Sequence, residues 1–293
     1  MAPGKVNLCL FLGGVRELDR RHRLVTVFEA VSLSDELTLE VLPPGAADEV
    51  RCPGVEGPNI VASALAGLRE RGWRAPPVRV AIEKRIPVAG GMGGGSADAA
   101  AALRLARELG GVEERWIAEL AIELGADVPA ALEPGLALGT GAGEVVERLG
   151  PLAEHAFAIV PLPCSLATPD VYREADRLGL ARSEDALKRL EASLRAALAS
   201  GQSAGLPVEL IHNDLEPAAS SLCPEVARAL AALRAAGAAQ ALVCGSGPTC
   251  AGLWWGRGAY ARARRAVAAL RERFPQASAV EPAGGIGHNW SRR

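Results

Sequence analysis

A stretch of glycines constrains the fold of this chain more than any other feature of its sequence. Five of the six residues from Gly90 to Gly95 are glycine, and the sixth is Met92. Glycine loses more backbone entropy on folding than any other residue, so a run of glycines indicates a backbone shape that other residues cannot adopt. The stretch therefore predicts a binding site.

The residues around this stretch predict a strand, a loop and a helix in succession. Residues 78–82 alternate like a half-buried strand. Apolar residues then recur at helical spacing from Ala99 to Leu109, with Ser96 expected at the N-cap and Gly110 at the end. Free N–H groups and the helix dipole converge at the start of such a helix, so we expect it to bind phosphate. A flexible linker is the alternative, which the regular spacing on both sides disfavours.

Three common phosphate-binding motifs do not describe the stretch. A P-loop ends in Lys-Ser or Lys-Thr, and this chain has no lysine between Lys84 and Lys188. The dinucleotide fingerprint requires glycine or alanine at the position of Ser96, with an acidic residue about 20 positions later. Protein kinases place the glycine loop before their Val-Ala-Ile-Lys strand, whereas the similar residues 80–84 precede the glycines here. The stretch is therefore another kind of phosphate site.

Composition limits the class of protein. The 293 residues suffice for about two domains, which we expect at residues 1–152 and 153–293. Hydrophobic residues make up 49% and charged residues 23%, as in globular proteins. The net charge of −2 indicates no nucleic-acid partner. We find no leader and no apolar run approaching about 18 residues, so we expect a cytoplasmic protein without a membrane span, as a monomer or a weak homodimer.

The six cysteines are scattered along the chain. They form no Cys-x-x-Cys pair, and no histidine cluster that would indicate a zinc site lies near them. We expect all of them to be buried free thiols in a reducing cytosol. The six are Cys9, Cys52, Cys164, Cys223, Cys244 and Cys250.

The N-terminal residues 2–12 predict an apolar strand that two polar residues interrupt. Lys5 and Asn7 occupy alternate positions, so they lie on the same face of the strand. A lone lysine there is normally an edge charge, but its pairing with an asparagine favours a site. Residues 25–31 and 37–42 predict two further strands separated by a turn.

Several single residues have both a structural and a functional interpretation. Asn59 is either the N-cap of a helix or part of a site. Asp127 is either a turn residue or a carboxylate directed toward the phosphate site. His22, after a charged connection, is either solvated or in contact with a polar substrate. Thr168 is expected at a helix N-cap, and residues 245–247 form either a plain hairpin turn or a turn whose N–H groups reach a ligand.

Three separated motifs together resemble the GHMP kinase superfamily of small-molecule kinases. They are Ala2-Pro-Gly-Lys-Val-Asn7, the segment from Pro87 to Ala97, and Cys244-Gly-Ser-Gly-Pro-Thr-Cys250. The resemblance implies an α+β fold of two domains. The N-terminal domain would have a mixed sheet and a left-handed βαβ-type ATP loop, and the C-terminal domain would be a ferredoxin-like α/β domain.

Within the superfamily, the chain is most similar to kinases of the non-mevalonate isoprenoid pathway. They use ATP to phosphorylate the tertiary 2-hydroxyl of a cytidine diphosphate-linked methylerythritol. The closer match rests on residues 86–96, 124–129, 168–172 and 213–217, and on His22. One alternative is a related kinase of homoserine, mevalonate or a sugar. The other is a non-catalytic member that binds a ligand without transferring phosphate.

The resemblance also implies roles for individual residues, with ATP and Mg²⁺ as cofactors. Asp127 would accept or orient the hydroxyl proton, and Lys5 would stabilise Asp127 and the developing charge. The expected ATP-binding residues are Asn59, Pro87, Val88, Ala89, Gly90, Gly91, Met92, Gly93, Gly94, Gly95, Ser96 and Ala97, with Ser96 also the candidate Mg²⁺ ligand. The expected substrate-binding residues are Asn7, Arg21, His22, Thr168, Gly245, Ser246 and Gly247.

The chain departs from this family just before His22. The family typically has an Asp-Gly pair and then a tyrosine that packs on cytosine, whereas this chain has Asp19-Arg20-Arg21. A guanidinium also stacks on a base, so Arg21 is the expected substitute. The altered loop favours a different alcohol substrate, while the segment 124–129 opposes it, and the intact Lys5 and Asp127 oppose a non-catalytic member.

Overall fold

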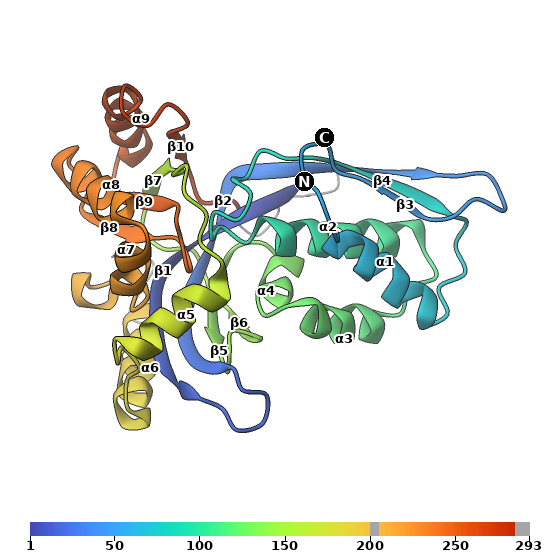
Figure 1. Ribbon diagram of the computed structural model, residues 1–293, viewed down its shortest axis with the longest axis horizontal. Coiled ribbons are helices and arrows are strands. Elements are labelled where there is room, and N and C mark those ends of the chain that lie inside the picture. The colour runs from blue at the N-terminus through green and yellow to red at the C-terminus, as the bar shows by residue number, and fades with distance from the viewer. Residues whose placement is uncertain (200–204, 285–293) are drawn as a thin grey trace.

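The computed structural model describes residues 1–199 and 205–284. Two sheets, each with helices against it, make up the molecule (Figure 1). The strands of the first sheet lie between residues 2 and 148, and those of the second between residues 155 and 280. The boundary expected after residue 152 falls between the two sheets. No helix in the described part of the chain is long and apolar enough to cross a membrane.

The first sheet is built around one long strand. Its order is β3-β4-β2-β5-β6, and β1 pairs separately with β2. The strands are β1 (Ala2–Val15), β2 (His22–Val41), β3 (Glu49–Arg51), β4 (Val78–Glu83), β5 (Leu136–Thr140) and β6 (Val145–Arg148). Both β4 and β5 run antiparallel to β2, with β4 along its residues 36–41 and β5 along its residues 26–29.

The prediction of two strands between residues 25 and 42 is wrong, because β2 continues through the polar residues 32–35. Ala2 and Pro3 of β1 pair with Asp35 and Ser34, which keeps this part extended. The Asp35 carboxylate accepts hydrogen bonds from the backbone N–H groups of Arg85 and Ile86, at 2.6 and 2.8 Å. The buried Asp35 side chain therefore has hydrogen-bond partners within the sheet, so β2 can continue through it.

Four helices lie on one side of this sheet, and the third of them packs mainly against the other three (Figure 1). They are α1 (Ile60–Glu70), α2 (Gly94–Leu109), α3 (Glu114–Leu124) and α4 (Val128–Leu132). The apolar side of α2 is mostly alanine, so the helix packs closely against α1, α4 and the sheet. Asn59 is the N-cap of α1, where its Oδ1 accepts from the Val61 N–H at 2.9 Å. Helix α4 was not predicted, because Asp127 was interpreted as a turn or loop residue.

The second sheet has the ferredoxin-like strand order. Its strands are β7 (His155–Val160), β8 (Gln240–Val243), β9 (Cys250–Trp255) and β10 (Ser278–Val280), arranged as β10-β7-β9-β8 with every pair antiparallel. Helix α8 (Pro224–Ala235) precedes β8, and α9 (Ala259–Leu270) joins β9 to β10. The segment between β7 and α8 contains α5 (Thr168–Arg177), α6 (Glu184–Ala199), the short 3-10 helix η1 (Val208–Leu210) and α7 (Glu216–Leu222).

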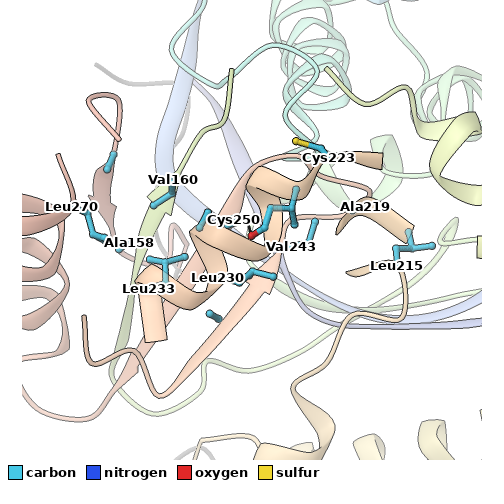
Figure 2. Close-up of a cluster of buried hydrophobic side chains, with 14 of the residues drawn as sticks. Ala158, Val160, Leu215, Ala219, Cys223, Leu230, Leu233, Val243, Cys250 and Leu270 are labelled. Atoms are coloured by element: carbon cyan, nitrogen blue, oxygen red, sulfur yellow. Dashed lines mark hydrogen bonds between the residues drawn. The ribbon is translucent and has the colours of Figure 1, made fainter. Parts of the chain in front are cut away.

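The second sheet is buried on both faces. Leu230 and Leu233 of α8 and Leu270 of α9 pack on one face, against Val160 and Val243 (Figure 2). The opposite face packs against β1 and β2 of the first sheet. This double burial explains why every residue of β7 is buried. The fold is α+β with two sheets, as expected from the sequence.

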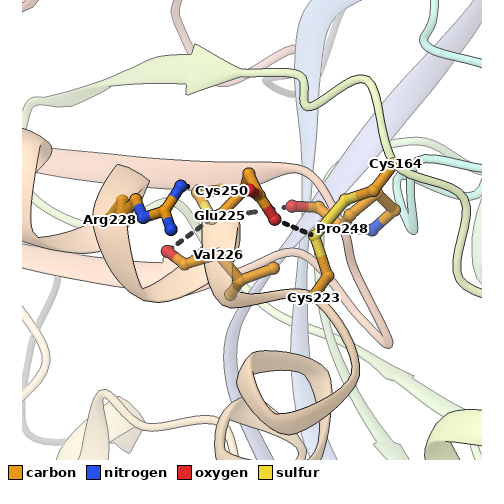
Figure 3. The surroundings of a disulfide bond; sticks show 7 residues. All are labelled: Cys164, Cys223, Glu225, Val226, Arg228, Pro248 and Cys250. Carbon is orange, nitrogen blue, oxygen red and sulfur yellow. Dashed lines mark hydrogen bonds and ion pairs between the residues drawn. A yellow bond between two sulfur atoms is a disulfide. The ribbon is translucent and has the colours of Figure 1, made fainter.

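The expectation of six buried free thiols is wrong for three of the cysteines. Cys164, in the connection after β7, forms a disulfide with Cys223, which follows α7 (Figure 3). The two are 59 residues apart in the chain, so their spacing gave no sign of the bond. Cys52 is a free thiol but only partly buried. The other three are buried free thiols, and burial raises the pKa of Cys9 and Cys244 to about 12.

Candidate active site

A cavity of about 970 Å³ is lined by residues of all three sequence motifs. Of the residues expected in the site, those on its wall are Lys5, Asn7, Arg21, His22, Asn59, the whole segment from Pro87 to Ser96, Asp127, Thr168, Gly245 and Ser246. The structure does not place Ala97 or Gly247 on the wall. Ala97 is buried among the α1, α2 and α3 side chains, and Gly247 packs beneath the turn against Val243.

The three motifs are joined through their backbones. The Thr249 N–H donates to the Gly90 carbonyl at 3.2 Å, and the Lys5 N–H donates to the Met92 carbonyl at 2.9 Å. At Gly91 a Cβ atom would lie 2.0 Å from the Cys244 carbonyl oxygen, so no larger residue fits there. The glycine loop therefore takes its shape from β1 and from the turn after β8.

Helix α2 begins one turn earlier than predicted, and Ser96 is not its N-cap. Gly93, with φ of +68°, occupies the cap position, and a Cβ there would lie 3.2 Å from the Lys5 side chain. The left-handed backbone at this point favours glycine, and Lys5 passes close beside it. Ser96 lies in the first turn, and Gly93 has no side chain that could cap the N–H groups there. Free N–H groups at a helix start are able to donate to an anion.

Lys5 and Asp127 lie side by side on the cavity wall. Lys5 Nζ lies 3.5 Å from Asp127 Oδ2, and the side chains are 15% and 33% exposed, respectively. Lys5 Nζ also donates to Asn7 Oδ1 at 2.7 Å, and Asn7 Nδ2 donates to Thr26 Oγ1 at 2.8 Å. Asn7 is almost fully buried, and both ends of its amide are engaged. The asparagine thus fixes the lysine, while the carboxylate stays open to a reactant.

His22 lies on another wall of the cavity, held rigidly. It begins β2 and is buried, with Nδ1 3.0 Å from the Gly13 carbonyl oxygen and Nε2 3.3 Å from Asp176 Oδ1. Its ring centroid is 5.2 Å from that of Tyr172. The interpretation of His22 as a solvated loop residue is wrong, because the turn before it folds back to pair β1 with β2.

Tyr172, on the cavity wall, and Asp176, which contacts His22, had been given no role from the sequence. Thr168, Tyr172 and Asp176 are spaced by four residues, which places them on one face of α5. That spacing was the available signal. The same face carries Thr168, whose hydroxyl lies 3.0 Å from Ser246 Oγ.

Thr168 was expected to be the N-cap of α5, but Ala167 occupies that position and Thr168 is the first helical residue. Its hydroxyl bonds Ser246 instead of its own helix. Asn213 holds the turn that carries Ser246. Its Nδ2 donates to the carbonyls of Val243 and Gly245 at 2.8 and 2.7 Å. The turn is therefore rigid where it meets α5.

The turn before His22 keeps a shape that favours glycine. Arg20 has φ of +60°, in the left-handed region. Arg16 holds this turn, because it bonds the Asp19 carboxylate and also donates to Glu144 at 2.5 Å. Arg21 lines the cavity, and its Nη2 donates to the Ala142 carbonyl at 3.3 Å. A guanidinium thus stands on the wall beside His22.

A buried charge cluster lies beside the glycine loop and had been missed as part of the site. Lys84 Nζ donates to Asp98 Oδ2 at 2.7 Å and also bonds the Asp35 carboxylate. Both Lys84 and Asp98 line the cavity. Burial, reinforced by Asp35 and opposed by Lys84, raises the pKa of Asp98 to about 7. Asp98 Oδ1 has no hydrogen-bond partner among the residues that the structure describes.

The charged side chains provide no complete metal cage. Within residues 1–199 and 205–284, no three His, Cys, Asp or Glu side chains gather to hold an ion. Mg²⁺ usually takes one or two protein ligands and completes its shell with phosphate oxygens and water. The Ser96 hydroxyl at the cavity wall fits a site of that kind.

Comparison with known proteins identifies the family. The family model described as GHMP kinases N terminal domain matches residues 59–135, and the model described as GHMP kinases C terminal matches residues 184–275. Together they cover more than half of the chain. The chain belongs to the GHMP kinases, which are ATP-dependent kinases of small molecules.

Individual relatives share one name. The 4-diphosphocytidyl-2-C-methyl-D-erythritol kinase of Mycolicibacterium gilvum is 44% identical over 265 residues, which cover 88% of this chain and 82% of that protein. The kinase of the same name from Nocardia farcinica is 46% identical over 264 residues, covering 85% and 82%. A crystal structure of 4-(cytidine 5'-diphospho)-2C-methyl-D-erythritol kinase matches with a TM-score of 0.78 and 33% identity, covering 97% of this chain and 98% of that one.

A more distant structure shares the fold alone. Homoserine kinase from Cytophaga hutchinsonii matches with a TM-score of 0.73 at 20% identity, covering 96% of this chain and 93% of that one. The fold is therefore common to kinases that act on different alcohols, and the substrate must be argued from the site.

Proposed function

We propose that this chain transfers the γ-phosphoryl group of ATP to the 2-hydroxyl of 4-diphosphocytidyl-2-C-methyl-D-erythritol. The relatives at 42–46% identity carry that substrate in their names. The single observation that carries the proposal is the Lys5–Asp127 pair, 3.5 Å apart, in one cavity with the glycine loop and the His22–Tyr172 pair. Such an arrangement can hold a polyphosphate and a nucleotide-linked alcohol on two sides of one carboxylate.

The ATP side would use the glycine loop and the start of α2. The N–H groups of residues 94–96 have no side-chain cap and can donate to the β- and γ-phosphates. Asn59, beside the apolar Val55 and Ile60 on the cavity wall, would face the adenine. Mg²⁺, when bound through Ser96, would neutralise charge on the phosphates.

The reaction centre would consist of Asp127 and Lys5. Asp127 would accept the proton of the attacking hydroxyl, which needs a positioned and accessible carboxylate. Lys5 would stabilise charge on the transferring group, because Asn7 directs its ammonium toward the carboxylate and the loop. The cation that a P-loop carries within the loop would come from β1 here.

The substrate side would bind cytosine between α5 and the turn before His22. The Tyr172 ring offers a stacking surface, and the Arg21 guanidinium offers a second one across the cavity wall. His22 would contact a polar edge of the base, and Asn7 would touch the erythritol part. Thr168 and the Gly245–Gly247 turn would contact the rest of the substrate.

The experiment measures ADP release with ATP, Mg²⁺ and a panel of alcohols. We expect turnover with the cytidyl diphosphate substrate and none with mevalonate or homoserine. The Arg20-Arg21 sequence is the one feature that favours another alcohol kinase. Turnover only on mevalonate, homoserine or a sugar would refute the proposed substrate. A lack of turnover on every compound would favour a non-catalytic binding protein.

We further propose a cytoplasmic monomer or weak homodimer with the domain division at residues 152 and 153. The placement of each sheet on one side of that point supports the division. Light scattering on the purified protein tests the oligomeric state. A tight dimer at nanomolar concentration would contradict it.

A further inference from the structure

One arginine holds the far end of the short helix that begins after Asp127. Arg104, in the second half of α2, donates from Nη1 to the carbonyls of Ala131 and Leu132 at 2.7 and 3.3 Å. These carbonyls lie in the last turn of α4, where no further helical N–H is available. A cation at this end of a helix is also favoured by the helix dipole.

Ala131 connects this contact directly to Asp127. Its carbonyl accepts from Arg104, and its N–H donates to the Asp127 carbonyl at 3.1 Å. The Asp127 side chain makes no capping bond of its own to α4. The orientation of the carboxylate therefore depends on where α4 lies.

The same guanidinium reaches the strand that carries Lys5. Arg104 Nη2 donates to the Met1 carbonyl at 2.8 Å, directly before β1. Burial lowers the pKa of Arg104 to about 10, so it is still charged at neutral pH. On the other side of α4, Arg148 of β6 donates to the Pro129 carbonyl at 3.1 Å. The short helix is thus held from two directions.

We propose that Arg104 is a positioning residue, which fixes α4 and the start of β1 against α2 so that Asp127 and Lys5 keep their geometry at the glycine loop. One guanidinium thereby links the segments that carry the phosphate loop, the proposed base and the proposed cation. The inference rests on the proposed role of Asp127 in phosphoryl transfer.

The test compares Arg104→Gln and Arg104→Lys with the matched control Arg107→Gln. Arg107 lies on the same helix, is about half exposed, and faces Glu114 at 3.5 Å instead of α4. We expect Arg104→Gln to lower kcat by roughly tenfold to a hundredfold, the usual effect of a small misplacement of a reacting group. Arg104→Lys should recover part of this loss, and Arg107→Gln should match the unmodified enzyme.

Two further measurements separate positioning from general damage. Calorimetric titration with a non-hydrolysable ATP analogue should give the same Kd for Arg104→Gln as for the unmodified protein, because the loop itself is unchanged. A Kd weakened as much as kcat would overturn the proposal. The loss of kcat should also persist at temperatures well below the Tm of the variant, and its disappearance there would overturn the proposal too.

A double variant distinguishes this inference from the proposed function. In an Asp127→Asn background, Arg104→Gln should lower the residual rate of radiolabelled phosphate transfer by a clearly smaller factor than in the unmodified enzyme, since only Lys5 remains to be positioned. If Asp127→Asn is slow and Arg104→Gln still lowers the rate by its full factor, the positioning role is refuted and the base is not. A near-normal rate for Asp127→Asn alone would refute both.

Discussion

Replacement of Gly91 by alanine tests whether the glycine loop is shaped by the turn after β8. Gly91 has φ of +80°, and an added Cβ would lie 2.0 Å from the Cys244 carbonyl oxygen and 2.8 Å from the Gly247 nitrogen. Both neighbours are backbone atoms, which cannot rotate away as a side chain would. Gly91→Ala must therefore push the loop and the turn apart.

The expected loss has two parts. The left-handed backbone conformation costs an L-residue about 1–2 kcal/mol. Forcing a methyl group into a filled space costs a further 1–3 kcal/mol or so. We expect a total of about 3 kcal/mol, which lowers the Tm of a chain of this size by roughly 6–12 °C. The displaced loop should also bind ATP at least tenfold more weakly.

Gly45→Ala is the matched control. Gly45 has φ of +89°, and nothing lies within 4 Å of an added Cβ. It therefore carries the backbone cost alone, and its Tm should fall by roughly 2–8 °C with unchanged ATP binding. Thermal unfolding and calorimetric titration with ATP measure both effects. If the two variants lose the same Tm and bind ATP equally well, the contact between loop and turn does not shape the site.

Three further changes have directions that follow from the structure. Asp127→Asn should lose most of kcat while ATP binding stays unchanged, and a near-normal kcat would remove its role as base. Arg20→Gly should raise Tm by roughly 1–4 °C, because glycine adopts the left-handed backbone of Arg20 without strain. This gain outweighs the conformational entropy that glycine adds to the unfolded chain. A lower Tm would contradict the prediction. Burial raises the pKa of Asp98 to about 7 in the folded chain, above its unfolded value of about 4. The protonated carboxyl therefore makes its full contribution to stability below about pH 4, and this contribution is lost as the pH rises through 7. Asp98→Asn should therefore reduce the fall of Tm between about pH 4 and about pH 7. Melting curves over a pH series measure this, and a slope of Tm against pH equal to that of the unmodified protein would contradict the prediction.

Local rules explain what the sequence predicted well. Lys5 and Asn7 were placed together because alternate residues of a strand share a face, and their side chains are hydrogen-bonded. The N-cap interpretation of Asn59, one of the two given to it, is confirmed, because its side chain needs only the next turn of the chain. The two-sheet fold was implied by the family resemblance, which does not rest on local rules.

The residues that escaped prediction depend on contacts between distant segments. In the sequence, Asp98 has the pattern of an ordinary polar residue on a helix. Lys84 reaches it only because β4 packs beside α2. Cys164 meets Cys223 because α7 folds back beside the connection after β7. Ser96 had a good N-cap sequence, yet the N-cap of the helix is Gly93, directly after Met92, whose carbonyl accepts from the Lys5 N–H. In each case a tertiary contact outweighed a local preference.

The contact of Gly90 and Gly91 with residues 244–249 limits how this loop can change in evolution or be transferred to another protein. A fragment that ended at residue 152 would contain every glycine of the loop but not the carbonyl and N–H groups on which the loop rests. The loop is therefore not a portable module. An engineer who exchanges it between kinases would have to move the turn after β8 with it, and mutations in the two segments should be accepted in pairs.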